Sequence, residues 1–343
     1  MSLNISVIIP AYSRFSHLRH AVESVLAQTV PVSEVIIVDD GSMDETPTMV
    51  PRLIAEDPRW RERVSYFYQE NQGQCVAINN GIARAKGDWL GFIAHDDLWL
   101  PWKLEWQFRA LEKFKDQAGL CFTDAWFMNN PHMKMNLFQF AGKQLPGSFG
   151  IIKDPDRLIV NPHPVWVQTC IARSDLVRQI NGFDPKLRYS EDHDFLFRMA
   201  LQTKFCYVGM PMTLIDRSPA DIRHVGEGRN WHKEEFCLQA DQYRFEKQLS
   251  LSEGLQPDVR KSILRNLRSV HSAWANLYLA KGDHTNAREA ISKAAEYELT
   301  PNLAFKWILS RFSPKLAKKV LSIRDKNPPT RHDRVSWQDK EES

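Results

Sequence analysis

The sequence predicts an α/β fold in which helices cover both faces of a mostly parallel sheet. Short apolar runs alternate with segments of helical periodicity from residue 5 to about residue 125, as in repeated strand–helix units. Turn residues such as Asp39-Asp40-Gly41 separate the two kinds of segment. From about residue 231 the pattern is helical only. We therefore expect a Rossmann-like sheet with flanking helices, followed by an α-helical C-terminal extension.

The first strands and helices follow from the period of the apolar residues. Five apolar runs are predicted to be strands, at residues 6–9, 35–38, 64–69, 89–93 and 120–123. Apolar residues at helical spacing predict helices over residues 17–28, 73–85 and 102–114. Ser42 and Glu45 have the spacing of a capping box, which predicts the start of another helix.

The later part of the chain is less regular. Residues 127–164 contain scattered Pro, Gly and Asn, which predicts loops and short pieces over one edge of the sheet. Ordered signals return as a strand at 165–172, a helix at 192–201 and a strand at 205–208, before a polar loop at 222–231.

The chain is expected to divide into three parts. Residues 1–230 form the α/β domain, residues 231–324 a helical extension, and residues 325–343 a polar tail that we expect to be disordered. The extension contains one helix pair with the spacing of a tetratricopeptide unit, carried by Trp274, Leu277, Tyr278, Gly282, Ala287, Ala290, Ala294 and Pro301.

Composition excludes several classes of function. The net charge of +3 is too small to predict nucleic acid as a partner. The five cysteines are far apart and form no C-x-x-C pair, so neither a disulfide framework nor a zinc site is predicted. The N-terminal residues lack a basic segment followed by a long apolar stretch, and no eighteen apolar residues run together, so neither a signal peptide nor a membrane span is predicted. These observations favour a protein of the reducing cytoplasm.

Polar residues follow four successive predicted strands: Pro10-Ala11-Tyr12, Asp39-Asp40, Glu70-Asn71-Gln72 and Asp96-Asp97. Open parallel sheets bind ligands at the carboxyl ends of their strands, so we expect these residues to converge. The chain lacks the glycine-rich loops that cradle phosphates. A phosphate ligand would then need Mg²⁺ or Mn²⁺, with Asp97 as the metal ligand and Asp96 towards the ribose and phosphates. The alternative is that these acids only cap helices.

Five motifs in order carry a resemblance to a known family. They are SVIIPAYSR, VIIVDDGSMDET, ENQGQCVAINNGIARAKGDW, FIAHDDLWLPWKLE and NGFDPKLRYSEDHDF. From about residue 5 to residue 230 the chain resembles the family 2 glycosyltransferases of GT-A fold, inverting enzymes that use nucleotide-activated sugars. The resemblance implies a GT-A sheet, a nucleotide-sugar donor and a divalent metal.

The resemblance also implies roles for residues of the donor side. Pro10, Ala11 and Tyr12 would line the nucleoside, Asp39 and Asp40 would bond the base, and Asn71, Gln72 and Asn79 would border the nucleotide and sugar. Asp96 and Asp97 stand at the family's D-x-D metal site. This copy has Ala94 where a first acid often lies, and Ile78 where an arginine is common.

The motif Ser190-Glu191-Asp192-His193-Asp194 is the candidate for the catalytic base. A single displacement at the anomeric carbon needs a group that takes the proton of the acceptor hydroxyl. By the resemblance that group is Asp192, with Glu191 and Asp194 on the acceptor side. From the residues alone, Glu191 and Asp192 would be interpreted as the capped start of a helix, where acids interact favourably with the helix dipole; the resemblance reverses that interpretation.

Three basic residues, Arg217, Arg223 and His224, lie in the predicted loop after residue 208. Guanidinium groups suit a diphosphate leaving group, and His224 could add a metal ligand; as solvated loop residues they would need no role. Trp99, Trp102, Trp126 and Trp166 could stack on sugars but are expected to pack in the core or at its rim. His163 is expected to be a loop residue without a catalytic role.

Residues 306–324 interleave basic and apolar residues in an amphipathic pattern. Such a helix could contact an anionic membrane surface, where lipid-linked acceptors are found, or pack on the preceding helix pair. Flotation of the full chain with anionic vesicles at low salt distinguishes the two, since a protein that stays at the bottom has no such contact.

The sequence as a whole predicts a metal-dependent inverting glycosyltransferase of the cytoplasm, peripheral at the inner face of the plasma membrane if the membrane contact exists. The expected donor is a nucleotide-sugar, most simply a UDP-sugar. The expected acceptor is a glycan or lipid-linked molecule of surface polysaccharide or glycoconjugate synthesis. One alternative is a non-catalytic GT-A-like nucleotide-binding or scaffold protein. Another is a nucleotidyltransferase, which would not use the Glu191-Asp192 motif.

Overall fold

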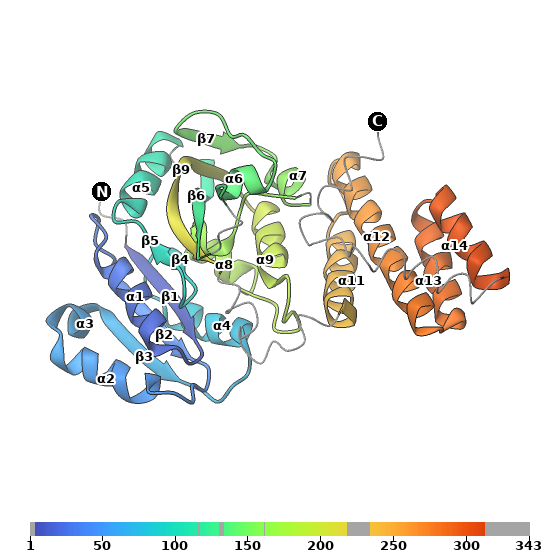
Figure 1. The fold of residues 1–343 in the computed structure, drawn as a ribbon. Coiled ribbons are helices and arrows are strands. Elements are labelled where there is room, and N and C mark those ends of the chain that lie inside the picture. Colours follow the sequence, from blue (N-terminus) through green and yellow to red (C-terminus); the bar gives the residue numbers. More distant parts are fainter. Residues whose placement is uncertain (1–3, 115–116, 130–133, 161, 218–233, 313–343) are drawn as a thin grey trace. The chain divides into compact units, whose positions relative to one another are not determined.

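The computed structural model describes residues 4–114, 117–129, 134–160, 162–217 and 234–312. The chain divides into two compact units, Met1–Arg229 and Asn230–Ser343. The first unit is built on one nine-stranded sheet with the order β3-β2-β1-β4-β8-β6-β9-β5, and β7 pairs with β9 (Figure 1). The α/β sheet with flanking helices and a helical C-terminal part, as predicted, is confirmed.

The first half of the sheet is parallel throughout. Its strands are β1 (Ile5–Ala11), β2 (Glu34–Asp39), β3 (Val64–Tyr68) and β4 (Trp89–Phe92). The connecting helices are α1 (Phe15–Leu26), α2 (Thr46–Glu56), α3 (Pro58–Arg63) and α4 (Gln74–Arg84). Parallel pairing places the carboxyl ends of these strands at one edge, which is where the polar residues of the four strands were predicted to converge.

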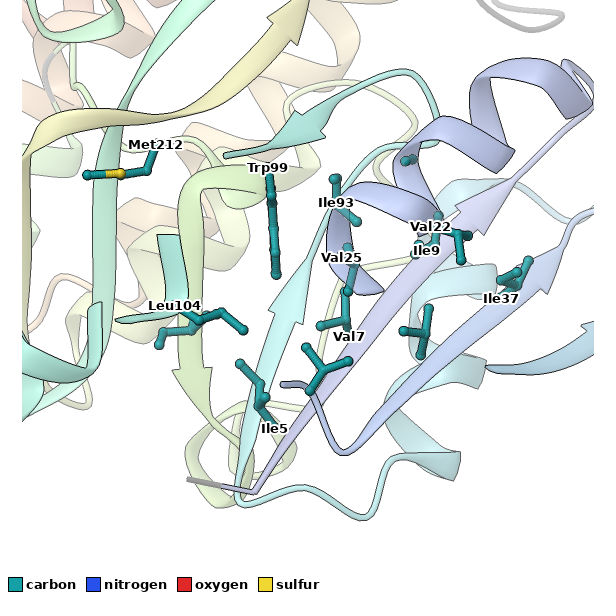
Figure 2. Close-up of a cluster of buried hydrophobic side chains, with 14 of the residues drawn as sticks. Ile5, Val7, Ile9, Val22, Val25, Ile37, Ile93, Trp99, Leu104 and Met212 are labelled. Carbon is teal, nitrogen blue, oxygen red and sulfur yellow. The ribbon is translucent and has the colours of Figure 1, made fainter. Parts of the chain in front are cut away.

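Side chains on both faces of β1 are buried. Val7 and Ile9 belong to a cluster with Val22 and Val25 of α1 (Figure 2). On the other face, a Cβ added to Gly81 of α4 would lie 2.5 Å from the Cγ2 atom of Ile8. The lack of a side chain at Gly81 therefore lets α4 approach the strand closely.

The second half of the sheet mixes directions. Its strands are β8 (Cys170–Arg173), β6 (Ala118–Met128), β9 (Lys204–Asp216), β5 (Leu98–Trp99) and β7 (Phe149–Ile152). β8 runs antiparallel between β4 and β6, whereas β6 and β9 are parallel. The sheet as a whole is thus mixed: its first half is parallel, as predicted, and β5 and β7 were not predicted. β5 is a two-residue strand, too short to carry a period.

Short helices complete the first unit. They are α5 (Lys103–Phe114), α6 (Leu137–Phe140), α7 (Pro155–Ile159), the 3₁₀ turn η2 (Val167–Thr169), α8 (Ser174–Gln179) and α9 (Glu191–Ala200). The 127–164 segment, predicted as loops and short pieces, includes the end of β6 as well as α6, β7 and α7.

The predicted capping box of Ser42 and Glu45 is wrong. α2 begins at Thr46, and its N-cap residue Glu45 makes no side-chain capping bond. The Ser42 hydroxyl instead accepts a hydrogen bond from the backbone N–H of Ser13 (2.7 Å), in the loop after β1. Ser42 lies four residues before the first residue of α2 and is therefore not its N-cap, and spacing alone could not show where the helix begins.

The second unit is helical. Its helices are α11 (Glu234–Ser250), α12 (Pro257–Lys281), α13 (His284–Tyr297) and α14 (Pro301–Phe312). Gly282 ends α12 at φ +79°, and Asp283 caps α13 by accepting a hydrogen bond from the N–H of Asn286. The helix pair lies where the tetratricopeptide-like unit was predicted.

No helix within the described ranges combines the length and the apolar character that crossing a bilayer requires. Most of the basic amphipathic segment 306–324, and all of the polar tail 325–343, lie outside the described residues.

Candidate active site

The loops after β1 and β2 are joined by hydrogen bonds from backbone N–H groups to serine hydroxyls. Ser13 and Arg14 follow β1 in the left-handed region, at φ 58° and 62°. The N–H of Ser13 donates to Ser42, and the N–H of Met43 donates to the Ser13 hydroxyl (3.3 Å). Residues other than glycine rarely adopt this backbone conformation. The hydrogen bonds therefore stabilise a strained turn at the end of β1.

Asp39 and Asp40, predicted to bond the nucleobase, are buried at the end of β2. Asp39 accepts hydrogen bonds from the N–H of Ser42 (2.8 Å) and from the Tyr66 hydroxyl. Asp40 accepts from the N–H groups of Gln72 (2.9 Å) and Gly73 (2.8 Å) and from the side chain of Gln69. Each carboxylate can accept about four hydrogen bonds, so both retain capacity for a ligand donor.

Asp40 thereby shapes the loop after β3. Its bonds to two successive N–H groups place Asn71 and Gln72, both exposed, beside the ends of β1 and β2. Pro10, Ala11 and Tyr12 adjoin them, because the N–H of Asp40 donates to the carbonyl of Ala11 (2.8 Å). The predicted nucleoside residues from three strands are therefore neighbours, and their roles stay predictions.

Asn79, predicted to border the nucleotide and sugar, has a structural partner. Its amide donates to the carbonyl of Phe183 (2.7 Å) and accepts from the N–H of Phe183 (2.8 Å). This two-bond clamp joins α4 to the segment that leads into α9. A contact between Asn79 and the donor remains a prediction.

The two acids after β4 have different surroundings. Asp96 is part-exposed, and its carboxylate lies 3.9 Å from the guanidinium of Arg14. Asp97 is only 2% exposed. Its Oδ1 atom accepts a hydrogen bond from the N–H of Asp216 (2.9 Å), and its Oδ2 atom accepts none from any residue that the structure describes.

The electrostatics around Asp97 disfavour an isolated negative charge. Burial, and after it the charge of Asp96, raise the pKa of Asp97 well above its ordinary value, while Arg217 opposes the rise. Asp216 also contributes its carboxylate, which accepts from the Asn129 amide (2.6 Å). Three acids thus lie near one another, with Arg217 as a nearby positive charge.

The donor set fits a divalent cation that is shared with a ligand. Within the described part of the chain, no group of three His, Cys, Asp or Glu side chains is placed to hold a metal by itself. Mg²⁺ and Mn²⁺ sites commonly use one or two carboxylates and complete their shell with substrate phosphates. The buried Oδ2 atom of Asp97, with Asp96 beside it, matches that pattern.

Arg217 is held at the end of β9. Its guanidinium lies over the ring of Trp166, with Cζ 4.6 Å from the ring centroid, and donates to the carbonyl of Asp216 (3.0 Å). The other predicted residues of this loop, Arg223 and His224, lie outside the described residues.

Asp192 lies in the first turn of α9, after Ser190 in the left-handed region at φ 59°. Its carboxylate accepts a hydrogen bond from the N–H of His193 (2.8 Å). The charge of Asp192 acts on the buried thiols of Cys75 in α4 and Cys170 in β8, and burial is the main cause that raises the pKa of both. Asp192 is therefore near both elements.

Glu191 and Asp194 differ in exposure. Glu191 is part-exposed beside Asp192, whereas Asp194 is fully buried and pairs with Arg198 at 2.7 Å. Acceptor-side roles for both stay predictions. Ring packing fixes the helix below them: Phe195 stacks on Phe183 at 4.3 Å, and both contact Phe92 edge-on.

The sequence did not indicate that Arg14, Asp216 and Tyr66 belong to the site. Arg14 lies within the quoted SVIIPAYSR motif, so its position after the strand was an available signal. No signal in the sequence indicated Asp216, because it lies beside Asp97 only through the pairing of strands that are far apart in the sequence.

The fold and the acid-bearing strand ends define an α/β protein of GT-A type. The family model "Glycosyl transferase family 2" matches residues 6–173, and this part of the chain belongs to that family. An uncharacterised glycosyltransferase of Rickettsia typhi is 30% identical over 199 residues, which cover 57% of this chain and 58% of that protein. The chain thus spans little more than half the length of this relative.

One further sequence relative and two solved structures are also similar to this chain. TuaG of Bacillus subtilis, named as a teichuronic acid biosynthesis glycosyltransferase, is 39% identical over 142 residues, covering 41% of this chain and 54% of TuaG. The crystal structure of Staphylococcus aureus TarS matches 94% of this chain and 55% of TarS, with a TM-score of 0.61 and 16% identity. A mannosyltransferase from Pyrobaculum calidifontis matches 95% of this chain and 87% of its own, with a TM-score of 0.54 and 17% identity.

Proposed function

We propose that the protein is an inverting glycosyltransferase that moves a sugar from a nucleotide-diphosphate sugar, a UDP-sugar in the first instance, to an acceptor hydroxyl. The acceptor would be a glycan or lipid-linked molecule of surface polysaccharide or glycoconjugate synthesis. The observation that carries the proposal is the Asp97 carboxylate, buried with an Oδ2 atom that accepts no hydrogen bond from the described residues.

The donor side would be held by residues of four strand ends, those of β1 to β4. Asn71, Gln72 and the Asp39–Asp40 pair would contact the nucleoside, with Tyr12 beside them. Asp97 and Asp96 would hold Mg²⁺ or Mn²⁺, which would neutralise the diphosphate and favour its departure. Arg217 and Arg14 would add positive charge near the same acids.

The base side would be Asp192. Its carboxylate accepts a hydrogen bond from the backbone N–H of His193, and a carboxylate has further lone pairs for an acceptor hydroxyl. By taking that proton as the sugar–phosphate bond breaks, Asp192 would make the oxygen a nucleophile. Glu191, which is part-exposed at the same helix start, would lie on the acceptor side.

Related proteins support the donor class. TarS has been crystallised with UDP and with UDP-GlcNAc, and the Pyrobaculum mannosyltransferase with GDP-Man and Mn²⁺. The name of TuaG supports polysaccharide synthesis as the process. Residues 306–324 carry the basic amphipathic pattern, which supports a peripheral position at the cytoplasmic face of a membrane.

The test is a thermal-shift screen of UDP, GDP, CDP and TDP, each with Mn²⁺, Mg²⁺ or EDTA. A ligand that binds only the folded state stabilises it by about 2.7 kcal/mol at 100 times its dissociation constant. We expect one nucleotide to raise the melting temperature by about 5 °C or more, and EDTA to abolish the rise. The absence of a rise for every combination would reject the proposal.

The alternative is a non-catalytic GT-A-like protein that binds a nucleotide or serves as a scaffold. Such a protein would also be stabilised by a nucleotide, but it would release no nucleotide from a sugar nucleotide. Slow hydrolysis of UDP-N-acetylglucosamine or GDP-mannose by the wild type, lost in Asp192→Asn, would favour the enzyme.

A further inference from the structure

A short segment between α7 and η2 touches both halves of the candidate active site. Residues 162–166 read Pro162-His163-Pro164-Val165-Trp166, and they lie in neither a helix nor a strand. Each proline locks its own φ near −65°, and the residue before a proline is restricted to extended conformations. The backbone of Pro162, His163 and Pro164 is therefore restricted without forming regular secondary structure.

Its first end contacts the residue beside the proposed base. The rings of His163 and His193 lie with centroids 4.4 Å apart. His163 is 5% exposed, and its Nδ1 atom accepts a hydrogen bond from the N–H of Val165 (3.3 Å), which orients the ring. The backbone N–H of His193 in turn donates a hydrogen bond to the carboxylate of Asp192. His163 is thus one residue contact away from Asp192.

Its second end contacts the metal side. The Trp166 ring packs on Phe127 at 5.6 Å between centroids, and Arg217 lies over its face. A cation over an aromatic ring is attracted by the ring quadrupole, so Trp166 restrains the guanidinium. Arg217 follows Asp216, whose N–H donates to Asp97. Trp166 is therefore one contact away from the residues that surround Asp97.

Chain geometry limits the distance between the two ends. Three residue steps of at most about 3.6 Å allow the Cα atoms of His163 and Trp166 to be at most about 11 Å apart. In a single displacement, the base and the leaving diphosphate lie on opposite sides of the anomeric carbon. The distance between the base and the groups that bind the diphosphate therefore affects the rate strongly.

We infer that the segment 163–166 is a positioning element that sets the separation of Asp192 and Asp97. His163 acts through His193, and Trp166 acts through Arg217. The inference rests on the proposed function, because it needs Asp192 as the base and Asp97 on the donor side. It assigns to this loop a role in the rate and in donor binding, beyond support of the fold.

The first experiment tests the His163 end in the full chain. Release of nucleotide is measured for UDP-N-acetylglucosamine and GDP-mannose with Mn²⁺, so no acceptor needs to be known. In His163→Ala, we expect kcat to fall about 10-fold or more, with donor KM and nucleotide-dependent stabilisation unchanged. His163→Phe keeps a ring against His193 and should recover most of the rate. His20→Ala, at an exposed histidine of α1, is the control.

The dependence on Asp192 separates positioning from general support. In the Asp192→Asn background, His163→Ala should cause no further loss, because the group that it positions can no longer act as a base. A merely structural role would instead lower the melting temperature and the rate together, in both backgrounds. Equal kcat for His163→Ala and His20→Ala would also overturn the inference.

The second experiment tests the Trp166 end. Trp166→Leu removes the ring under Arg217, and we expect donor KM to rise about 5-fold or more with a smaller change in kcat. Trp166→Phe retains an aromatic face and should stay near the wild type. A rise in KM of the same size in both variants would contradict the role of the ring.

Failure of the proposed function has a different signature. If the wild type is stabilised by no nucleotide and releases none, the enzyme assignment falls and this inference falls with it. If the wild type turns over and the His163 and Trp166 variants match the controls, only the positioning role is rejected.

Discussion

At the scale of single residues, Asp96 and Asp97 are adjacent in sequence but have different surroundings. Asp96 is part-exposed and faces Arg14. Asp97 is buried and accepts a hydrogen bond from the backbone N–H of Asp216. Burial raises the pKa of Asp97, and the charge of Asp96 adds to the rise. A bound cation would remove both penalties, which explains why such a pair can persist at a strand end.

The two proposed roles of acids make separable predictions. Asp97→Ala should lose the metal-dependent stabilisation by nucleotide, because it removes a proposed ligand. Asp192→Asn should keep that stabilisation and lose about 100-fold or more in the rate of nucleotide release, the scale of general base catalysis. Both are measured by thermal shift and by nucleotide release from UDP-N-acetylglucosamine and GDP-mannose.

Asp88→Asn is the matched control for these variants. Asp88 is exposed and directly precedes β4, at the end of the strand opposite to Asp97. It should match the wild type in both assays. Turnover by Asp192→Asn near the wild-type rate would show that another group is the base.

At the scale of elements, α4 and α9 are joined through the segment at Gly182 and Phe183. Asn79 of α4 makes two hydrogen bonds to the backbone of Phe183, whose ring stacks on Phe195 of α9. Gly182 has φ +60°, and a Cβ there would lie 2.4 Å from the Oδ1 atom of Asn79. A side chain at Gly182 would therefore break the clamp as well as strain the backbone.

Gly182→Ala should lower the free energy of unfolding more than Gly142→Ala does. Gly142 has a similar φ of +62° with no atom within 4 Å of an added Cβ, so it isolates the cost of the backbone, about 1 to 2 kcal/mol. We expect Gly182→Ala to lose at least about 1 kcal/mol more, since a buried hydrogen-bonded pair is disrupted. Calorimetry measures both; equal losses would mean that the clamp adds little to stability.

At the scale of the whole molecule, one buried charge affects how stability depends on pH. Lys103 of α5 is fully buried, donates to the Gln107 side chain at 2.8 Å and lies 4.0 Å from the Trp99 ring centroid. Burial lowers the pKa of Lys103 to about 7. Between this value and the unfolded value near 10.5, the unfolded chain binds the proton and the folded protein does not. Stability from this group therefore rises with pH in that window.

We expect the free energy of unfolding to rise by about 1 to 2 kcal/mol between pH 7.0 and 8.5 on account of Lys103, since one proton contributes about 1.4 kcal/mol per pH unit. Lys103→Met should lack this increment and be more stable than the wild type at pH 7. Lys113→Met, at an exposed position of the same helix, is the control. Identical pH slopes for wild type and Lys103→Met would show that Lys103 keeps an ordinary pKa.

Much of the fold could be predicted because its signals are local. The parallel strands β1 to β4 each contain an apolar run that a period of a few residues reveals, and each was expected within a few residues of its observed bounds. β5 and β7 could not be predicted, since two or four residues carry little pattern and both owe their place to pairing with β9. Lys103 also gave no sign of burial, because it lies next to an apolar stripe rather than in it.

The sequence by itself determined the α/β class, the family and the acids at the strand ends, because these depend on local periodicity and on short motifs. Only the tertiary structure decided that Asp97 rather than Asp96 is buried, and that its partner is Asp216, 119 positions later. It likewise brought His163 to His193 and Trp166 to Arg217. The physical reason is that strand pairing and side-chain packing join distant segments, and no pattern within either segment records which partner it will meet.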